Sequence, residues 1–189
     1  MAVLPIRITG DPVLHAVARP VTVFDDSLES LVADMVETMK AAPGVGLAAP
    51  QVGAGLRLFV YEWIDDDDNH WRGTAINPEL WISPTPIGEP DDEAESEGCL
   101  SIPGERFALR RAELAILRAV DLDQKPFEVN ADGWLARIFQ HEFDHLNGVL
   151  YADRLDHANA KIAAKVTKKN GWGLPELSWL PGMDHLEGY

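Results

Sequence analysis

The segment 131–147 constrains the fold most strongly, because its apolar residues recur with the period of a helix and two histidines share that helix. Its apolar side is traced by Leu135, Ile138, Phe139, Phe143 and Leu146, with Glu142 among them. Gly148 follows, where a helix C-terminus commonly has glycine. A helix with such an apolar side must be covered by the rest of the chain. We therefore expect it at the centre of the fold.

The remaining pattern predicts strands in runs, with one helix near each end of the chain. The N-terminal helix covers 28–39, is capped by Asp26 or Ser27 and ends by Pro43. The C-terminal helix covers 158–169. The predicted strands, rich in β-branched and aromatic residues, are 56–63, 74–82, 107–109, 113–120 and 127–129.

Proline, glycine and acidic residues mark the irregular segments. These are the acidic loop after Trp63, the segment 84–97 and a glycine-rich turn at 44–53. The whole pattern predicts an α+β fold, a single domain of residues 1–189 with antiparallel sheets packed around the central helix. Its end, 170–189, is expected to be an extended tail packed by its tryptophans.

The composition excludes several classes of protein. The chain has 189 residues, of which 46% are hydrophobic and 25% charged, so it can bury a core without disulfides. It has one cysteine, no signal peptide and no apolar run near the roughly 20 residues that span a bilayer, which predicts a cytoplasmic protein. A net charge of −15 argues against nonspecific nucleic-acid binding. No sequence-specific nucleic-acid partner and no membrane partner are expected.

The sequence His141-Glu142-Phe143-Asp144-His145 predicts a metal site on the central helix. Histidines four residues apart lie one turn from each other and about 40° apart around the axis, so both imidazoles can bind one ion. Glu142 cannot bind the ion in the same geometry and would exchange protons with a bound water. An amphipathic helix that happens to carry two histidines is the alternative.

Two histidines leave a tetrahedral ion short of ligands, and Cys99 is the predicted third ligand. Proteases with this motif take it downstream, but neither His157 nor His185 falls at a recognised spacing. A lone cysteine is more often a small buried apolar residue. Beside an incomplete site we favour ligation, since thiolate is a good ligand for zinc or ferrous iron. One position would remain open for a water, which indicates hydrolysis of a carbonyl compound.

Three segments together resemble the peptide deformylase family, and its actinobacterial branch in particular. They are Gly44-Val45-Gly46-Leu47-Ala48-Ala49-Pro50-Gln51, Glu97-Gly98-Cys99-Leu100-Ser101 and Gln140-His141-Glu142-Phe143-Asp144-His145. All three are complete and in the family's order, and the resemblance covers roughly residues 5 to 155. It implies removal of the formyl group from N-formyl-methionyl nascent peptides, with release of formate.

The resemblance implies roles for the residues of these segments. One divalent ion, usually Fe²⁺ in the family with Zn²⁺, Ni²⁺ or Co²⁺ as alternatives, would be held by Cys99, His141 and His145. Glu142 would be general base and then general acid. The Gln51 side chain and the Leu100 N–H would donate to the formyl oxygen.

Further residues would bind the peptide or brace the site. Gly46 would hydrogen-bond the substrate's main chain, Arg106 would lie near the cleft, and an ion pair of Glu97 with Arg111 would brace the metal loop. The pocket for the methionine side chain would be lined by Val45, Trp134 and Ile138. Ordinary core packing is the alternative for these three.

Two other functions and one partner stay open. A metallopeptidase that cuts internal peptide bonds would share the histidine helix but would have no use for Cys99 and Gln51. A non-catalytic metal-binding module is the second alternative. The C-terminal helix carries four lysines, which indicate a solvated basic face or, as in some family members, a ribosome-docking surface. They are Lys161, Lys165, Lys168 and Lys169.

Overall fold

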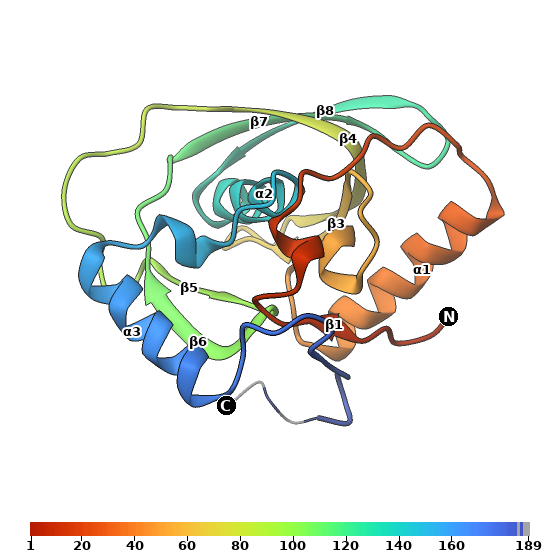
Figure 1. The fold of residues 1–189 in the computed structure, drawn as a ribbon. Coiled ribbons are helices and arrows are strands. Elements are labelled where there is room, and N and C mark those ends of the chain that lie inside the picture. The colour runs from red at the N-terminus through yellow and green to blue at the C-terminus, as the bar shows by residue number, and fades with distance from the viewer. Residues whose placement is uncertain (185, 187–189) are drawn as a thin grey trace.

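A curved antiparallel sheet covers the central helix α2 (Gly133–Leu146) in the computed structural model, which describes residues 1–184 and 186 (Figure 1). In spatial order its strands are β2 (Gly46–Ala48), β3 (Leu58–Ile64), β4 (His70–Ile82), β7 (Leu114–Val120) and β8 (Pro126–Asp132). Two two-stranded antiparallel sheets lie on the other side of α2 (Figure 1). They are β1 (Ile6–Arg7) with β9 (Ser178–Trp179), and β5 (Ser96–Cys99) with β6 (Ile102–Ala108).

Helices flank this arrangement near both ends of the chain. They are α1 (Asp26–Ala41) and α3 (His157–Lys169), with short 3₁₀ helices η1 (Pro12–His15), η2 (Ala49–Val52) and η3 (Tyr151–Arg154). The predicted α+β fold, with antiparallel sheets around the central helix and a helix near each end, is therefore confirmed. No helix among the residues described is both long and apolar enough to cross a membrane.

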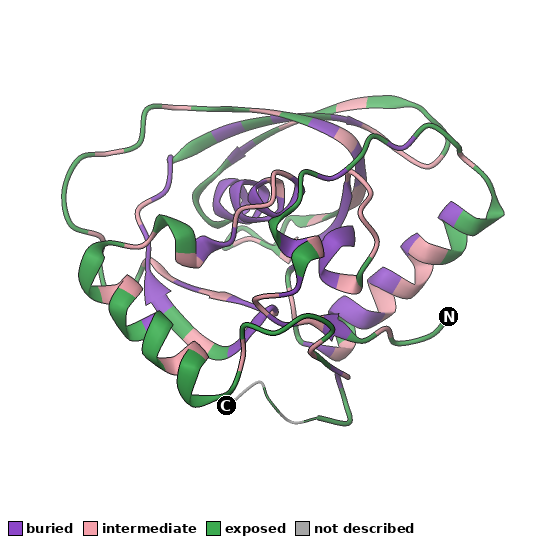
Figure 2. Cartoon of the chain, in the orientation of Figure 1, coloured by how far each residue is buried: buried purple, intermediate pink, exposed green. Residues whose placement is uncertain are grey.

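The helix α2 is buried almost all around, although only one of its sides is apolar (Figure 2). Its apolar side packs on the sheet, where the rings of Phe139 and Tyr61 meet edge to face with centroids 5.0 Å apart. Burying one such ring stabilises the fold by about 1.5–3 kcal/mol. Several of its buried polar residues have hydrogen-bond partners: the Gln140 amide both donates to and accepts from the backbone of Ala112. A central position thus requires a polar network on the second side of the helix.

Several element boundaries differ from the predictions. The cap of α1 is Asp25, not Asp26 or Ser27, because its extended backbone lets its carboxylate accept from the N–H groups of Ser27 and Leu28. The helix α2 begins at Gly133, since Ala131 and Asp132 are held in β8 by pairing with β7.

Two segments predicted to be irregular contain strands. The predicted turn 44–53 holds β2 and η2, because Gly46–Ala48 pair with β3. The segment 84–97 ends in β5, where Ser96 and Glu97 pair with β6. The strand β3 ends at Ile64 and β4 starts at His70, which shortens the acidic loop between them. Sheet partners distant in sequence decide these boundaries.

The described residues of the tail, 170–184 and 186, form turns and the short strand β9, which pairs with the N-terminal segment. Trp179 and Ser178 of β9 pair with Ile6 and Arg7 of β1. Trp179 is buried in the core and Trp172 packs against it in part. Residues 185 and 187–189 of the tail, including the candidate ligand His185, lie outside the described residues.

Candidate active site

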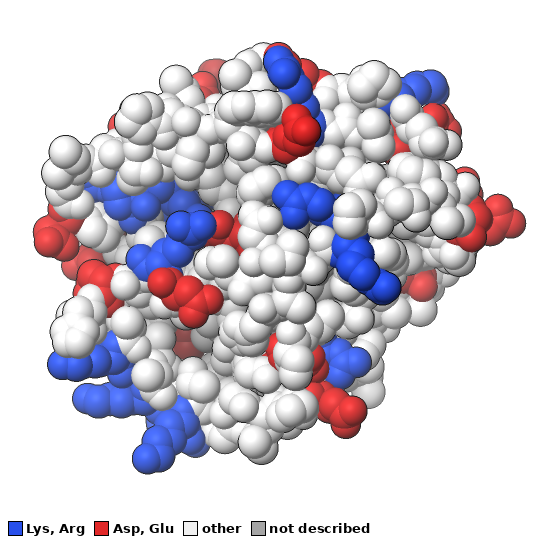
Figure 3. Space-filling view, turned by 45° about the horizontal axis from the view of Figure 1, so that its top comes forward, with Lys and Arg blue, Asp and Glu red and all other residues white. Residues whose placement is uncertain are grey.

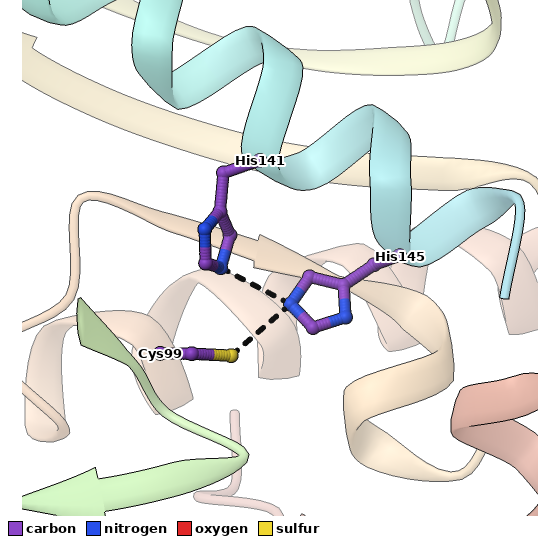
Figure 4. A group of neighbouring side chains, drawn as sticks. All are labelled: Cys99, His141 and His145. Carbon is purple, nitrogen blue, oxygen red and sulfur yellow. Dashed lines mark hydrogen bonds between the residues drawn. The ribbon is translucent and has the colours of Figure 1, made fainter. Parts of the chain in front are cut away.

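Three donor atoms from two distant segments meet beside α2 (Figure 4). The Sγ of Cys99 lies 3.3 Å from Nε2 of His145, which lies 3.2 Å from Nε2 of His141, and all three donor atoms lie within 4.8 Å of one another. Ligands bound to one tetrahedral ion at about 2.0–2.3 Å are themselves roughly 3.3–3.8 Å apart. The spacing therefore suits a shared ion, with the three residues predicted from the sequence as its ligands.

A local irregularity aims the thiol at the histidines. The pairing of β5 with β6 shifts between Gly98 and Cys99: Gly98 faces Arg106, while Cys99 faces Ile102. The extra residues, 103–105, lie in β6, and such an irregularity changes the direction of the side chains beside it. The cysteine is buried, and the two imidazoles approach it from successive turns of α2 (Figure 4).

A buried carboxylate orients the first histidine. Glu97 Oε1 lies 2.7 Å from Nδ1 of His141, which leaves Nε2 of that ring facing the thiol and the second imidazole. Arg111 reaches both oxygens of Glu97, at 2.6 and 3.1 Å. Burial raises the pKa of Glu97, but the hydrogen bonds and positive charges of His141 and Arg111 outweigh it and hold that pKa well below its usual range. Glu97 is thus a carboxylate, and the predicted ion pair with Arg111 is present.

Glu142 lies beside these groups with one oxygen unpartnered. Its Oε2 is buried and has no hydrogen-bond partner among the described residues. Burial raises the pKa of this carboxyl to about 7, in spite of the nearby charge of His141. A Cβ on Gly46 would come within 2.3 Å of its Oε1, so only glycine leaves room for this carboxylate. A group with such a pKa can both accept and donate a proton near neutral pH.

The amide of Gln51 points toward the thiol. Its Oε1 accepts from the backbone N–H of Ala48 at 2.8 Å, which directs Nε2 toward Cys99 and Ser101. The distances are 3.8 Å from Nε2 to Cys99 Sγ and 3.4 Å to Ser101 Oγ. Because Gln51 is buried, its amide N–H is a fixed donor beside the three-donor cluster.

These groups open into a cavity of about 430 Å³, within the size range of ordinary ligand pockets. Its lining includes Val45, Gly46, Gln51, Glu97, Cys99, Leu100, Arg106, Trp134, Ile138, His141 and Glu142. Val45 and Trp134 are each 38% exposed, whereas Ile138 is buried and belongs to the core as well. His145 and Arg111 lie behind the lining.

Comparison with known proteins identifies the family. Residues 3–161 match the family model described as polypeptide deformylase. The chain belongs to the peptide deformylase family. Peptide deformylases of Tropheryma whipplei (strain TW08/27) and Mycobacterium marinum are each 50% identical to it. The alignments cover 95% of this chain and 94% of the first relative, and 96% of both chains for the second.

Solved structures agree. A peptide deformylase from Ehrlichia chaffeensis superimposes with a TM-score of 0.78 at 35% identity, covering 90% of this chain and 98% of that one. One from Legionella pneumophila gives 0.76 at 38% identity, covering 90% and 96%. The prediction of a hydrolase of the deformylase family, with actinobacterial relatives, is confirmed. The internal-bond metallopeptidase is not supported.

Three charged residues that brace this deformylase site from behind, Asp144, Arg137 and Arg154, were not predicted from the sequence. Asp144 accepts from Arg111 at 2.6 Å and from Arg154 through two bonds of 2.6 Å. Arg137 donates to Glu97 at 3.0 Å and to the carbonyl of Leu109 at 2.6 Å. Asp144 could have been suspected, as a polar residue between the two histidines. No local signal marks Arg137 or Arg154, since only the tertiary structure brings them to the network.

Proposed function

We propose that this deformylase hydrolyses the formyl amide of N-formyl-methionyl peptides and releases formate at the cavity beside α2. One observation carries the proposal: Cys99, His141, the unpartnered Glu142 carboxylate and the Gln51 amide line a single cavity, with His145 completing the three-donor cluster directly behind it. A formyl carbonyl needs such groups around it, namely an electrophile, a proton carrier and a hydrogen-bond donor.

The three-donor cluster is proposed to hold one divalent ion, with iron as the native metal. One thiolate and two imidazoles suit Fe²⁺, Zn²⁺, Ni²⁺ and Co²⁺ alike, so the donor set fits. A bound ion would supply Lewis-acid polarisation of the carbonyl and acidify a water. Because thiolates and ferrous ions react with oxygen species, activity should decay in air and persist longer with nickel or cobalt. Metal analysis of protein purified without oxygen tests this, and a fully active, air-stable zinc form would contradict the iron assignment.

Glu142 is proposed to carry the proton. Its free Oε2 accepts a proton from the attacking water, and the same oxygen then delivers it to the amide nitrogen that leaves. A pKa of about 7 suits both steps at neutral pH. Burial keeps other hydrogen-bond partners away from that oxygen between the two steps.

The Gln51 amide and the backbone N–H of Leu100 are proposed to stabilise the formyl oxygen as negative charge develops on it. Both residues line the cavity, and the Gln51 amide is held in one orientation by the Ala48 N–H. A donor already in place needs no reorganisation during the reaction. Losing one such donor typically lowers turnover by about 10²–10³-fold.

The substrate main chain is proposed to lie along the residues before and within β2. This strand is at the edge of the five-stranded sheet, so an extended peptide could pair with it near Gly46. Arg106, on β6, would lie beside the same cleft. The methionine side chain would enter among Val45, Trp134 and Ile138, which supply the apolar wall.

The nascent chain on the ribosome is the proposed source of the substrate, which places the enzyme in the cytoplasm. Four lysines of α3 are exposed, and Figure 3 shows basic side chains gathered at the end of the molecule where α3 lies. Docking on ribosomal RNA would use this face. Co-sedimentation with ribosomes should fall on changing the four lysines to glutamine, and unchanged co-sedimentation would contradict docking through α3.

The decisive experiment measures formate released from formyl-Met-Ala-Ser, with metal content determined on the same sample. The unformylated twin peptide is the control. We expect the amount of formate released to be proportional to the bound metal. We expect the unformylated peptide to remain intact. Cleavage of an internal bond in both peptides would indicate a metallopeptidase, and no formate from the fully loaded protein would refute the proposal.

A further inference from the structure

The loop 99–101 carries several of the groups assigned above. Cys99 supplies the thiol, Leu100 supplies the backbone N–H proposed above to donate to the formyl oxygen, and the Ser101 hydroxyl lies 3.4 Å from the Gln51 amide. A small displacement of this loop would therefore move the Leu100 N–H relative to the Gln51 amide, which the Ala48 N–H holds in place. A misplacement of about 1 Å can cost roughly 10²-fold in rate.

Both ends of the chain hold this loop by hydrogen bonds to its carbonyls. The indole N–H of Trp179 donates to the carbonyl of Leu100 at 2.8 Å. The backbone N–H of Thr9 donates to the carbonyl of Ser101 at 2.8 Å. The carbonyls of Leu100 and Ser101 are thus hydrogen-bonded to the C-terminal and the N-terminal segment, respectively.

The two terminal segments are joined to each other as well as to the loop. Trp179 pairs with Ile6 across β9 and β1, and the carbonyls of Leu177 and Thr9 accept from Ile8 and Gly173. Trp179 is only 3% exposed and lies in the core cluster against which Leu100 also packs. A buried indole N–H needs a hydrogen-bond acceptor, and here the acceptor is the Leu100 carbonyl. The side chain of Trp179 thus packs in the core and makes this hydrogen bond at the same time.

We propose that Trp179 is a positioning residue for deformylation, which holds Leu100 so that its N–H and the adjoining Gln51 amide meet the formyl oxygen. The proposal rests on the function proposed above. The C-terminal tail is then part of the active-site framework, although none of the described tail residues lines the cavity. Loss of the indole N–H should slow the chemical step and leave substrate binding and metal binding nearly unchanged.

The test is Trp179→Phe, which keeps an aromatic ring in the core and removes the donor. We expect kcat on formyl-Met-Ala-Ser to fall about tenfold, with KM within about twofold and metal content unchanged. In the zinc-loaded protein the ¹⁵N order parameters of Leu100 and Ser101 should drop from about 0.85, typical of rigid backbone, toward about 0.6. If the parent protein releases no formate, the proposed function fails, while the order parameters still test the brace.

Two further variants exclude a loss of fold as the cause. Trp172→Phe is the matched control, because Trp172 is a partly buried tryptophan of the same tail, and its indole donates no hydrogen bond within the described part of the chain. Replacing Trp179 by benzothienylalanine keeps the bicyclic shape and exchanges N–H for sulfur. If Trp179→Phe does not fold, this variant tests whether the indole N–H is needed for kcat. Parental kcat and order parameters in the benzothienylalanine variant, or an equal loss in Trp172→Phe, would overturn the proposal.

Discussion

Glu142 and Asp144 are two carboxylates of the same turn of α2, yet their surroundings are opposite. Glu142 faces the cavity with one buried oxygen unpartnered. Asp144, two residues on, faces away from that cavity and accepts from Arg111 and Arg154. Residues two apart on a helix point in nearly opposite directions, so one short motif can serve both sides.

The difference shows how the helix separates reactivity from stability. On the cavity side a carboxylate is buried without full compensation, which costs stability and raises its pKa. On the other side each charge is compensated, and the network continues from Asp144 through Arg111 and Glu97 to His141 of the three-donor cluster. The ion-pair network on the Asp144 side can therefore hold the cavity side of α2 in place. We expect substitutions on the cavity side to lower activity and substitutions on the Asp144 side to lower stability.

The largest effect is expected from Glu142→Gln, which removes the proton carrier and keeps the side-chain shape. General acid–base catalysis typically contributes about 10²–10⁴-fold, so kcat should fall by that factor. The metal content and the melting temperature should stay at or above the parental values, since a buried unpartnered charge is lost. Formate release and calorimetry measure the two, and activity within tenfold of the parent would remove Glu142 from the mechanism.

On the other side of the helix, Asp144→Ala should act on stability first. It leaves two arginines without their shared acceptor, and breaking a buried ion pair from one side costs about 3–5 kcal/mol in the free energy of unfolding. Urea unfolding measures this. Asp123→Ala is the control, because its ion pair with Lys125 is 72% exposed on both sides and should matter little. If Asp144→Ala were as stable as the parent protein, Asp144 would not stabilise the fold and the proposed difference from Glu142 would be wrong.

Gly46→Ala probes the contact between β2 and the reactive carboxylate. The added Cβ would come within 2.3 Å of Glu142 Oε1, so Glu142 must shift, and we expect kcat to fall about 10- to 100-fold. Gly55→Ala is the control, since no atom lies within 4 Å of a Cβ built there. Equal kinetics for the two alanine variants would show that the position of Glu142 is not critical.

Arg154→Ala should have the smallest effect. This side chain is 49% exposed, and Arg111 still compensates Asp144 in its absence. Solvent screening limits such a pair to about 0–1 kcal/mol in unfolding free energy. A much larger loss in urea unfolding would mean that Arg154, rather than Arg111, dominates the network.

The helix and its pair of histidines were predictable because their signals are local. The histidine spacing and the apolar period of 131–147 belong to one helix, and both appear in α2. The cap of α1 was predicted one or two residues too late, because Asp25, Asp26 and Ser27 are all residue types that cap helices. The strand β5 was not predicted, because Ser96 and Glu97 become a strand only by pairing with β6. The pattern of the tail indicated that its tryptophans pack, but nothing in it indicated which carbonyl the indole of Trp179 would reach.

By itself, the sequence determined the α+β class, the central helix and the chemistry of the donors, because helical periodicity and ligand type are properties of neighbouring residues. The tertiary structure decided which distant groups meet: the thiol with the imidazoles, Arg111 with Asp144, and Trp179 with Leu100. These contacts depend on sheet register, on the register shift between β5 and β6 and on the pairing of the two terminal segments. Such features arise from long-range pairing, for which no short stretch of sequence carries the information.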